Sequence, residues 1–347
     1  MNNRKTLLSI MISNALAMPL AVQANELEIY GTIAAAVENL DNSTKKTTEV
    51  SSNHSVFGIK GSTKIDDDLK GVFLLDVFLG SDSGDSGNGS LYGEGRDGYV
   101  GLQGNFGTVA LGYHGRPWKT STNDMDIFGS TIADYSALMG TVPGTDGVYF
   151  DAGIANAVLW FLPDYKGFSG HLQYGADEQD NESNDIGAQF NYTTKDLYLV
   201  VSHDIDGRTG GSDVKATKLA GEYRFGATTV GAIFDTISDS PGNTRDAYWL
   251  AASHQIGKET LKIAFAQAGD SDAGNDGATY FALGLDHGFK NNLKAYIIYS
   301  KISNENGGNY GYISAPHTST NGNTAVVTGA DSDVLAVGIK MDFSFKK

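Results

Sequence analysis

Residues 112–147 combine charged and aromatic side chains in a way that no later segment repeats. The segment carries bases, acids and large apolar groups, among them Arg116, Trp118, Lys119, Asp124, Asp126, Asp134 and Tyr135. A connection of this length without regular structure is usually either disordered or functional. Its many aromatic and branched residues argue against disorder. Because opposed charges can impose a field on a passing solute, we predict a loop that folds inward and narrows a pore.

Motifs for bond chemistry are weak in this sequence. Residues 93–98 (GEGRDG) match G-x-G-x-x-G, but a predicted strand follows them, which argues against a nucleotide site. Residues 84–88 (GDSGN) resemble a serine-protease nucleophile loop, yet only His54 precedes them. The histidines lack metal spacing such as H-E-x-x-H, and the acidic loops at 82–85 and 270–276 lack the Gly and Glu of a calcium loop. We expect no enzyme activity, metal or cofactor.

The composition indicates an exported, acidic protein. Arg4 and Lys5 precede a short apolar stretch, and residues 22–24 (VQA) supply a small-residue cleavage site. We therefore predict a signal peptide at 1–24 and one domain at 25–347. Cleavage would remove two of the 25 Lys and Arg and none of the 41 acids, which changes the net charge from -16 to -18. This acidity argues against nucleic acid as a partner.

Period-two alternation dominates the rest of the chain. In residues 333–345, Leu335, Val337 and Ile339 fall on one face, and Ala336, Gly338 and Lys340 fall on the other. Similar runs predict about sixteen strands, at 27–39, 54–65, 71–80, 96–103, 107–113, 154–163, 169–177, 185–194, 197–206, 214–225, 228–237, 245–256, 260–269, 278–288, 293–303 and 332–345.

The connections between these runs are short and long in turn, which is typical of outer-membrane barrels. After the signal there is no run of about 18 apolar residues, so we expect no membrane helix. We predict an all-β fold: a transmembrane antiparallel up-and-down β-barrel with an inward-folded third loop. A closed barrel leaves no unpaired edge in lipid. We expect apolar outward faces and polar inward faces around a wet lumen. A soluble sandwich or propeller is disfavoured, because its faces would not divide so cleanly.

Four stretches resemble a known family. They are LEIYGTIAAAVEN (27–39), SVFGIKGSTKIDDDLKGVF (55–73), RDGYVGLQGNFGTVALGY (96–113) and NAVLWFLPDYKGFSGHLQY (156–174). Their order and spacing are similar to those of the trimeric general diffusion porins of Gram-negative outer membranes, in the branch related to neisserial porins. The resemblance implies a homotrimer in the outer membrane, in contact with lipid and lipopolysaccharide and inserted by the barrel-assembly machinery.

The chain also departs from that family. Tyr113, Leu159 and Ala34 stand where the family often has basic residues. The family usually ends on Phe, whereas here Phe345 is followed by Lys346 and Lys347.

The resemblance further implies that acids on the inward loop face bases on the barrel wall. The loop acids are Asp124, Asp126 and Asp134. The candidate bases, from inward parity in their strands, are Lys60, Lys64, Arg96, Lys218, Arg224, Lys262 and Lys340. Arg116 and Lys119 either act from the loop itself or tie it to the wall. The alternative is that the inward charges only solvate a wet lumen.

These observations predict a channel for passive diffusion of small hydrophilic solutes and ions. Because three wall-base positions are replaced and the chain is acidic, we expect a preference for cations. The alternative is a porin selective for oligosaccharides, in which Trp118 and Tyr135 stack on the solute. Trp160 fits better in the aromatic belt at the membrane interface. An adhesin acting through the loop at 304–330 could coexist with either function.

Overall fold

The computed structural model describes residues 26–82, 92–140, 150–176, 184–207, 213–239, 243–272, 274–312 and 327–347. The predicted signal peptide at 1–24 lies outside this part of the chain. Among the described residues, no helix is long and apolar enough to cross a membrane.

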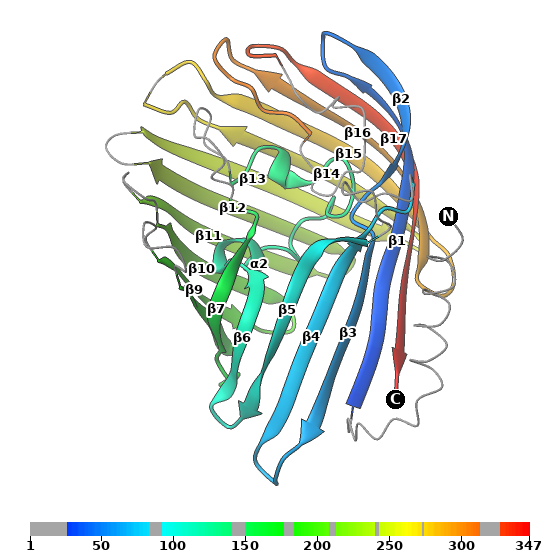
Figure 1. Ribbon diagram of the computed structural model, residues 1–347. Coiled ribbons are helices and arrows are strands. Elements are labelled where there is room, and N and C mark those ends of the chain that lie inside the picture. Colours follow the sequence, from blue (N-terminus) through cyan, green and yellow to red (C-terminus); the bar gives the residue numbers. More distant parts are fainter. Residues whose placement is uncertain are drawn as a thin grey trace, which may run out of the picture.

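The described residues form one antiparallel sheet that closes on itself (Figure 1). Apart from β2 and β3, which both pair with β1, each strand pairs with its neighbours along the chain, and the last strand pairs with the first over Glu28–Asp41. The strands are β1 (Glu26–Asp41), β2 (Lys46–Ser52), β3 (Val56–Lys64), β4 (Lys70–Leu79), β5 (Tyr92–Gly104), β6 (Gly107–Gly115), β7 (Gly153–Phe161), β8 (Phe168–Gly175), β9 (Asp185–Thr193), β10 (Leu197–Asp206), β11 (Val214–Phe225), β12 (Thr228–Asp239), β13 (Asn243–Ile256), β14 (Glu259–Ala268), β15 (Ala278–Gly288), β16 (Leu293–Asn304) and β17 (Ser332–Lys346).

The predicted sixteen-strand barrel is confirmed, because β2 and β3 share one position in the wall. β1 pairs with β2 along Ala35–Asp41 and with β3 along Glu26–Thr32. Each predicted strand overlaps one of the other sixteen described strands. The prediction missed β2, whose sequence KTTEVSS has only one large apolar residue and therefore no apolar alternation.

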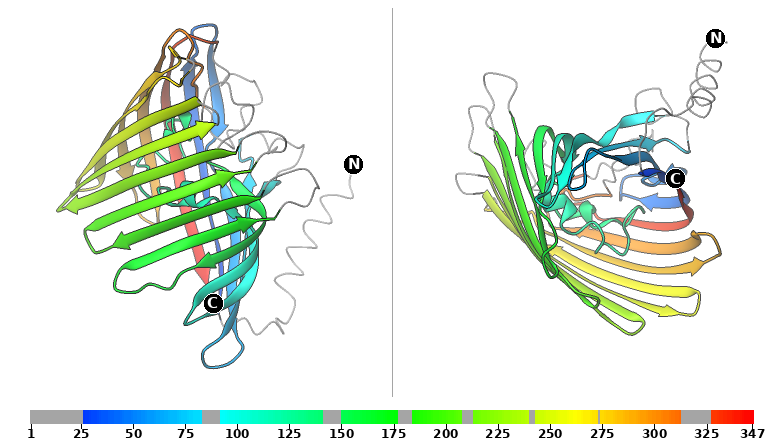
Figure 2. Two further views of the ribbon diagram at one scale, coloured as in Figure 1. Left: turned by 90° about the vertical axis from the view of Figure 1, so that its left-hand side faces the viewer. Right: turned by 90° about the horizontal axis from the view of Figure 1, so that it is seen from below.

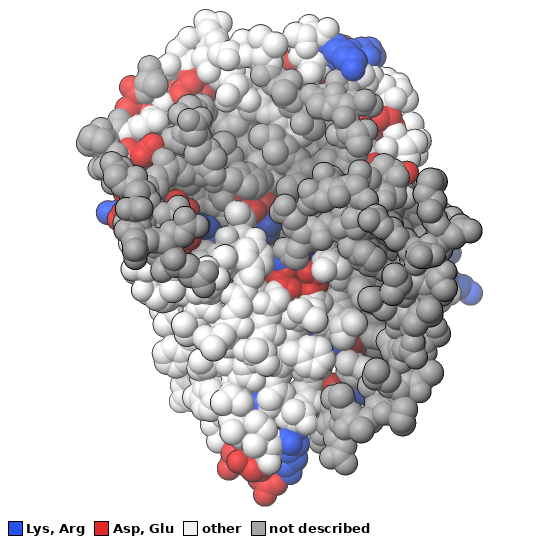
Figure 3. All heavy atoms as spheres, in the orientation of Figure 1, with Lys and Arg blue, Asp and Glu red and all other residues white. Residues whose placement is uncertain are grey.

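The outer face of the barrel is apolar, as the alternation predicts. In β17, Leu335, Val337 and Ile339 are 48%, 55% and 49% exposed, whereas the intervening Val334 and Ala336 are fully buried. In the view of Figure 3, charged residues are sparse over the described wall at β3–β7 and gather at the lower tip, where the β3–β4 turn carries Asp66, Asp67 and Asp68. This pattern leaves a band of apolar surface around the wall.

The inner face differs from the prediction. We expected polar inward side chains throughout, but the inner face of β11–β17 is largely apolar and forms a core with the inward loop. Ile233, Trp249 and Ile298 are at most 2% exposed. The reason is that the loop packs against this half of the wall and excludes water from it. Polar groups therefore face the lumen only where the loop does not cover the wall.

Residues 116–140 form the inward loop, which lies inside the ring of strands (Figure 2, right). It begins with the short helix α2 (Pro117–Thr120), with Pro at its first position, where a backbone N–H would have no partner. It ends near the 3₁₀ turn η1 (Tyr135–Ala137), whose N-cap Asp134 accepts a hydrogen bond from the Ser136 backbone. The predicted inward fold of this segment is confirmed within the described residues.

Two wall glycines allow the loop to approach closely. A Cβ atom at Gly187 would lie 2.6 Å from Cδ of Pro117, and one at Gly284 would lie 2.8 Å from Cε1 of Phe128. Larger side chains at these positions would push the loop away from the wall.

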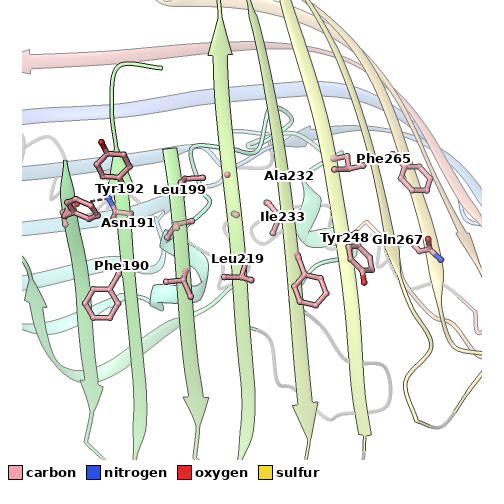
Figure 4. Close-up of a pocket in the computed structure, with 18 residues that line it drawn as sticks. Phe190, Asn191, Tyr192, Leu199, Leu219, Ala232, Ile233, Tyr248, Phe265 and Gln267 are labelled. Carbon is pink, nitrogen blue, oxygen red and sulfur yellow. Dashed lines mark hydrogen bonds between the residues drawn. The ribbon is translucent and has the colours of Figure 1, made fainter. Parts of the chain in front are cut away.

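A large hollow of about 880 Å³ lies along β8–β14 (Figure 4). Its lining includes Phe190, Leu199, Leu219 and Tyr248, which are 45% to 52% exposed on the outer face of the barrel. It is a groove in the apolar outer wall. It is separate from the lumen that holds the charged groups.

Candidate functional site between the loop and the wall

A cavity of about 420 Å³ separates the inward loop from the opposite wall. From the loop and the segment after it, it is lined by Lys119, Asn123, Asp124, Asp126, Ile127, Gly129, Ser130, Asp134, Tyr135 and Asp151. From the wall, it is lined by Thr32, His54, Val56, Arg96, Lys294 and Lys340. Most carboxylates therefore lie on the loop side and most bases on the wall side.

Asp126 lines the cavity and also holds the loop together. Its two carboxylate oxygens accept hydrogen bonds from the backbone N–H groups of Phe128 at 2.9 Å and Tyr135 at 3.0 Å. Burial raises the pKa of Asp126 well above its usual range, and the nearby Asp134 carboxylate raises it further. The charge that Asp126 presents to the cavity therefore depends on pH more than that of an exposed aspartate.

Asp134 behaves in the same way as Asp126. Burial raises the pKa of Asp134, and the Asp151 carboxylate adds to this effect. Its side chain accepts a hydrogen bond from the Ser136 backbone at 2.9 Å. Asp124 is exposed on the same side of the cavity. All three predicted loop acids thus line one cavity.

The bases that line the cavity each have a carboxylate partner. The pairs are Arg96–Asp76 at 3.4 Å, Lys294–Asp286 at 3.1 Å, Lys340–Asp342 at 3.9 Å and Lys119–Asp151 at 3.6 Å. Lys294 and Lys340 are direct neighbours across β16 and β17. The positive charge of Lys294 is balanced only in part, because Lys262 lies 2.6 Å from the same Asp286 carboxylate.

Lys218 was a candidate cavity base, but the structure places it behind the loop. It is fully buried, and its ammonium donates hydrogen bonds to the Trp118 carbonyl at 2.8 Å and to the Thr122 hydroxyl at 2.7 Å. The same ammonium lies 3.1 Å from the centroid of the Trp118 ring. Lys218 anchors the loop to β11 and does not line the cavity.

Arg116 also ties the loop to the wall. Its guanidinium pairs with Asp185 of β9 at 3.0 Å and with Asp206 of β10. Of the two roles left open for this residue, the structure favours the salt bridge. Lys119 differs, because it lines the cavity.

The other candidate bases lie outside the cavity. Lys60 pairs with Glu28 at 3.4 Å, Lys64 with Asp67 at 2.6 Å in the β3–β4 turn, and Arg224 with Glu222 at 2.7 Å. Lys262 is buried against Asp286 at 2.6 Å and lies 5.7 Å from the centre of the Phe128 ring. Strand parity predicted that these bases point into the barrel, and this was correct for several of them. They do not line the cavity, because they lie at other heights along the barrel or are covered by the loop.

Trp118 cannot stack on a solute in this arrangement. Its side chain is fully buried between the wall and the loop, and its ring lies 6.3 Å from the ring of Phe150. Tyr135 lines the cavity but is only 3% exposed, and its hydroxyl is hydrogen-bonded to that of Thr122 at 2.8 Å. Trp160 is 41% exposed on the outer wall, where the interface belt was expected.

Sequence reasoning missed several functional positions. Lys294 lies on the inward face of β16, so parity could have found it. Arg245 has inward parity in β13 and is fully buried, where it donates to the Leu138 carbonyl at 3.0 Å. Asp151 lies after the loop, where no alternation pointed to it. His54 begins the predicted strand 54–65 with the parity of Lys60 and Lys64, but it was not chosen as a site residue.

Comparison with known proteins agrees with this architecture. Residues 9–307 match the family described as Gram-negative porin. The chain is 23% identical over 336 residues to the major outer membrane protein P.IB of Neisseria gonorrhoeae, across 85% of this chain and 92% of that protein. It is 26% identical over 259 residues to outer membrane porin protein 32 of Delftia acidovorans, across 70% and 72%.

Solved structures share the fold at low sequence identity. The anion-selective porin from Comamonas acidovorans superposes with a TM-score of 0.79 at 21% identity, covering 91% of this chain and 99% of that one. OmpT from Vibrio cholerae, in its trimer form, superposes with a TM-score of 0.65 at 20% identity, again covering 91% and 99%.

Proposed function

Because the chain belongs to the Gram-negative porin family, we propose that it carries small hydrophilic solutes and ions by passive diffusion through the cavity beside the inward loop. It is a porin of the outer membrane of a Gram-negative bacterium. The observation that carries the proposal is the arrangement of the cavity, with loop carboxylates on one side and wall bases on the other.

Opposed charges across a narrow section select for polar solutes. They orient water and dipolar solutes, and an apolar solute must break that order to pass. The screening length is about 8 Å at physiological ionic strength, so charges within the cavity act on a passing ion more strongly than those in distant loops. We assign the selective role to Asp124, Asp126 and Asp134 on one side and to Arg96, Lys294 and Lys340 on the other.

We further propose a preference for cations. Each base of the cavity lies within 4 Å of a carboxylate, although Lys294 shares the Asp286 carboxylate with the buried Lys262. No ion pair within 4 Å joins Asp124, Asp126 or Asp134 to a base among the described residues. These three carboxylates outnumber the one base that shares its partner, so the net charge of the cavity is negative when they are ionised, and rings of acids favour cations. The Comamonas protein that shares this fold is named as anion-selective, and the proposal expects the opposite preference here.

Planar-bilayer recording tests the proposal. Purified protein should form open channels, and the reversal potential across a KCl gradient should have the sign of a K⁺ preference. Liposomes containing the protein should swell in small neutral sugars at rates that fall with sugar size. Channels that favour Cl⁻ would refute the ion preference, and liposomes that do not swell would refute the pore.

The remaining expectations are proposals as well. We propose a homotrimer, a cleaved signal peptide at 1–24, contact with lipid and lipopolysaccharide, and insertion by the barrel-assembly machinery. The two lysines after Phe345 fit a closed barrel, because Lys347 exchanges backbone hydrogen bonds with Leu27 at 2.9 and 3.3 Å. Lys346 also lies 3.4 Å from the Glu28 carboxylate. Crosslinking in membranes tests the trimer, and N-terminal sequencing of the mature protein tests cleavage.

A further inference from the structure

The wall is interrupted between β2 and β3, next to the cavity. β1 pairs with β2 above the break and with β3 below it, and residues 53–55 lie between the two strands. His54 has a φ of 57°, in the left-handed region. Few residues other than Gly adopt this conformation, although His, Asn and Asp do so more often than most. Breaks of this kind are common beside functional sites, where they redirect a side chain.

A chain of serine hydroxyls stabilises the break. The Ser81 hydroxyl donates to Ser52 at 2.8 Å, Ser52 donates to Ser55 at 3.0 Å, and Ser55 donates to the Ala34 carbonyl at 3.0 Å. The Ala34 N–H donates back to the Ser55 hydroxyl at 3.0 Å. These bonds satisfy backbone groups of β1 that the missing stretch of strand would otherwise have paired. The break is therefore a built feature of the wall.

Its consequence is that His54 lines the cavity on the basic side. The imidazole packs edge-on against Phe78, with ring centroids 5.2 Å apart. The Arg96 guanidinium lies 5.8 Å from the centre of the same Phe78 ring. Within the described part of the chain, no hydrogen bond occupies the ring nitrogens of His54. One nitrogen can donate to a solute and the other can accept.

Charged groups share the cavity with His54 from three strands, from the loop and from the segment after the loop. They are Arg96 of β5, Lys340 of β17, Lys294 of β16, and Lys119, Asp124, Asp126, Asp134 and Asp151 of the loop and the segment after it. Burial lowers the pKa of His54 well below its usual value, and Arg96, Lys119 and Lys340 lower it further. The ring is therefore neutral at pH 7 and gains a charge only in acid.

We propose that His54 is a specificity-determining residue of this channel: a neutral imidazole set among the bases of the cavity, where it hydrogen-bonds to polar solutes and limits the positive charge that they meet. This inference rests on the proposed channel function. A lysine or arginine at the same position would add a permanent charge to the basic side. The imidazole keeps the cavity selective for cations at neutral pH and adds its charge when the pH falls.

Three variants test the role of His54. His54→Lys should shift the reversal potential toward anions at pH 7, because it adds a fixed charge to the cavity. His54→Asn keeps a residue that tolerates the left-handed backbone but has a shorter side chain that does not titrate. It should match the wild type in reversal potential at pH 7 and lose part of the acid-induced shift toward anions. His254→Lys, at an exposed histidine that does not line the cavity, is the matched control and should change neither quantity.

The outcomes separate the two claims. If the wild type forms no channel, the proposed function fails. If the wild type conducts and His54→Lys has the wild-type reversal potential at pH 7, the role of His54 is overturned. If His54→Lys does not fold, the comparison of His54→Asn with the wild type between pH 7 and pH 4 decides: identical reversal potentials at every pH overturn the inference, and a smaller acid shift in the variant supports it.

Discussion

The two sides of the inward loop use charge in different ways. The side that faces the cavity presents carboxylates to water, opposite bases that line the wall. The side that faces β10–β14 is buried. The charged side chains of the wall on this side, such as Lys218 and Arg245, are buried and contact the loop backbone. Lys218 and Lys340 illustrate the contrast, since both point inward from their strands. Lys218 is fully buried under the loop, whereas Lys340 borders open volume.

The loop is therefore attached to one part of the wall and presents its carboxylates to the opposite part across the cavity. The backbone N–H of Trp118 donates to the Asp204 carboxylate at 2.8 Å, and the backbone N–H of Gly140 donates to the Asp235 carboxylate at 3.3 Å. These bonds hold both ends of the described loop. A loop held at both ends keeps its carboxylates at a constant distance from the opposite bases. Substitutions on the buried side of the loop should change stability, and substitutions on the side that faces the cavity should change ion preference.

The largest effect is expected on the buried side, from Arg245→Ala. The variant leaves Asp235 buried without its partner at 3.7 Å and frees the Leu138 carbonyl. Removing one member of a buried pair costs about 3–5 kcal/mol, so the free energy of unfolding in detergent should fall by that amount. Lys64→Ala, at the exposed pair with Asp67, is the control and should cost at most about 1 kcal/mol. Equal losses in the two variants would show that the buried contact does not hold the loop.

Trp118→Ala should weaken the same side by removing a large buried ring. Deleting a buried Trp typically costs about 3–5 kcal/mol, and here it also removes the partner of the Lys218 ammonium. We expect lower stability and noisier single-channel current, since the loop is no longer pinned. Trp160→Ala on the outer wall should leave the current noise unchanged. Quiet channels in Trp118→Ala would indicate that the loop is held without this ring.

On the side that faces the cavity, Asp126→Asn should lower the preference for cations. The amide oxygen can keep one of the two backbone hydrogen bonds, while the negative charge is lost. The ratio of K⁺ to Cl⁻ permeability, obtained from reversal potentials, should fall toward one. Asp67→Asn in the β3–β4 turn removes the same charge outside the cavity and should have no effect. Unchanged conductance and ion preference in Asp126→Asn would mean that Asp126 does not border the ion path.

The smallest effect is expected from pH alone. Because burial and neighbouring carboxylates raise the pKa of Asp126 and Asp134, both should lose their charge at a higher pH than the usual value of about 3.9. The preference for cations should therefore decline as the pH falls, beginning above that value. The raised pKa values also determine how the two groups change the free energy of unfolding with pH. The contribution of these groups is fully present below their unfolded pKa and is lost as the pH rises through the folded pKa.

The double variant Asp126→Asn with Asp134→Asn serves as the control for this titration. It should lose the part of the acid shift that comes from Asp126 and Asp134. A preference for cations that is constant from pH 7 to pH 4 in the wild type would contradict the raised pKa values.

Local patterns were sufficient for the strands but not for the site. Alternation is a property of neighbouring residues, so it located β17 and its outward Leu335 without knowledge of the fold. Parity also identified Lys218 and Lys340 as inward, but it could not separate an anchor from a cavity base. That distinction depends on which half of the wall the loop covers, which arises from contacts between distant residues. His54 has the same parity as Lys60 and Lys64 in the predicted strand 54–65, but alternation did not reveal the break that precedes β3 and sets this residue beside the cavity.

The central claim is that solutes pass between the loop and the opposite wall, and a thiol introduced there tests it most directly. The chain has no cysteine, so Asn123→Cys gives a single reactive group at an exposed position that lines the cavity. Leu335→Cys on the outer wall is the control. A charged, membrane-impermeant thiol reagent should reduce the single-channel current of Asn123→Cys and leave that of Leu335→Cys unchanged. Complete labelling of Asn123→Cys with no change in current would contradict the account.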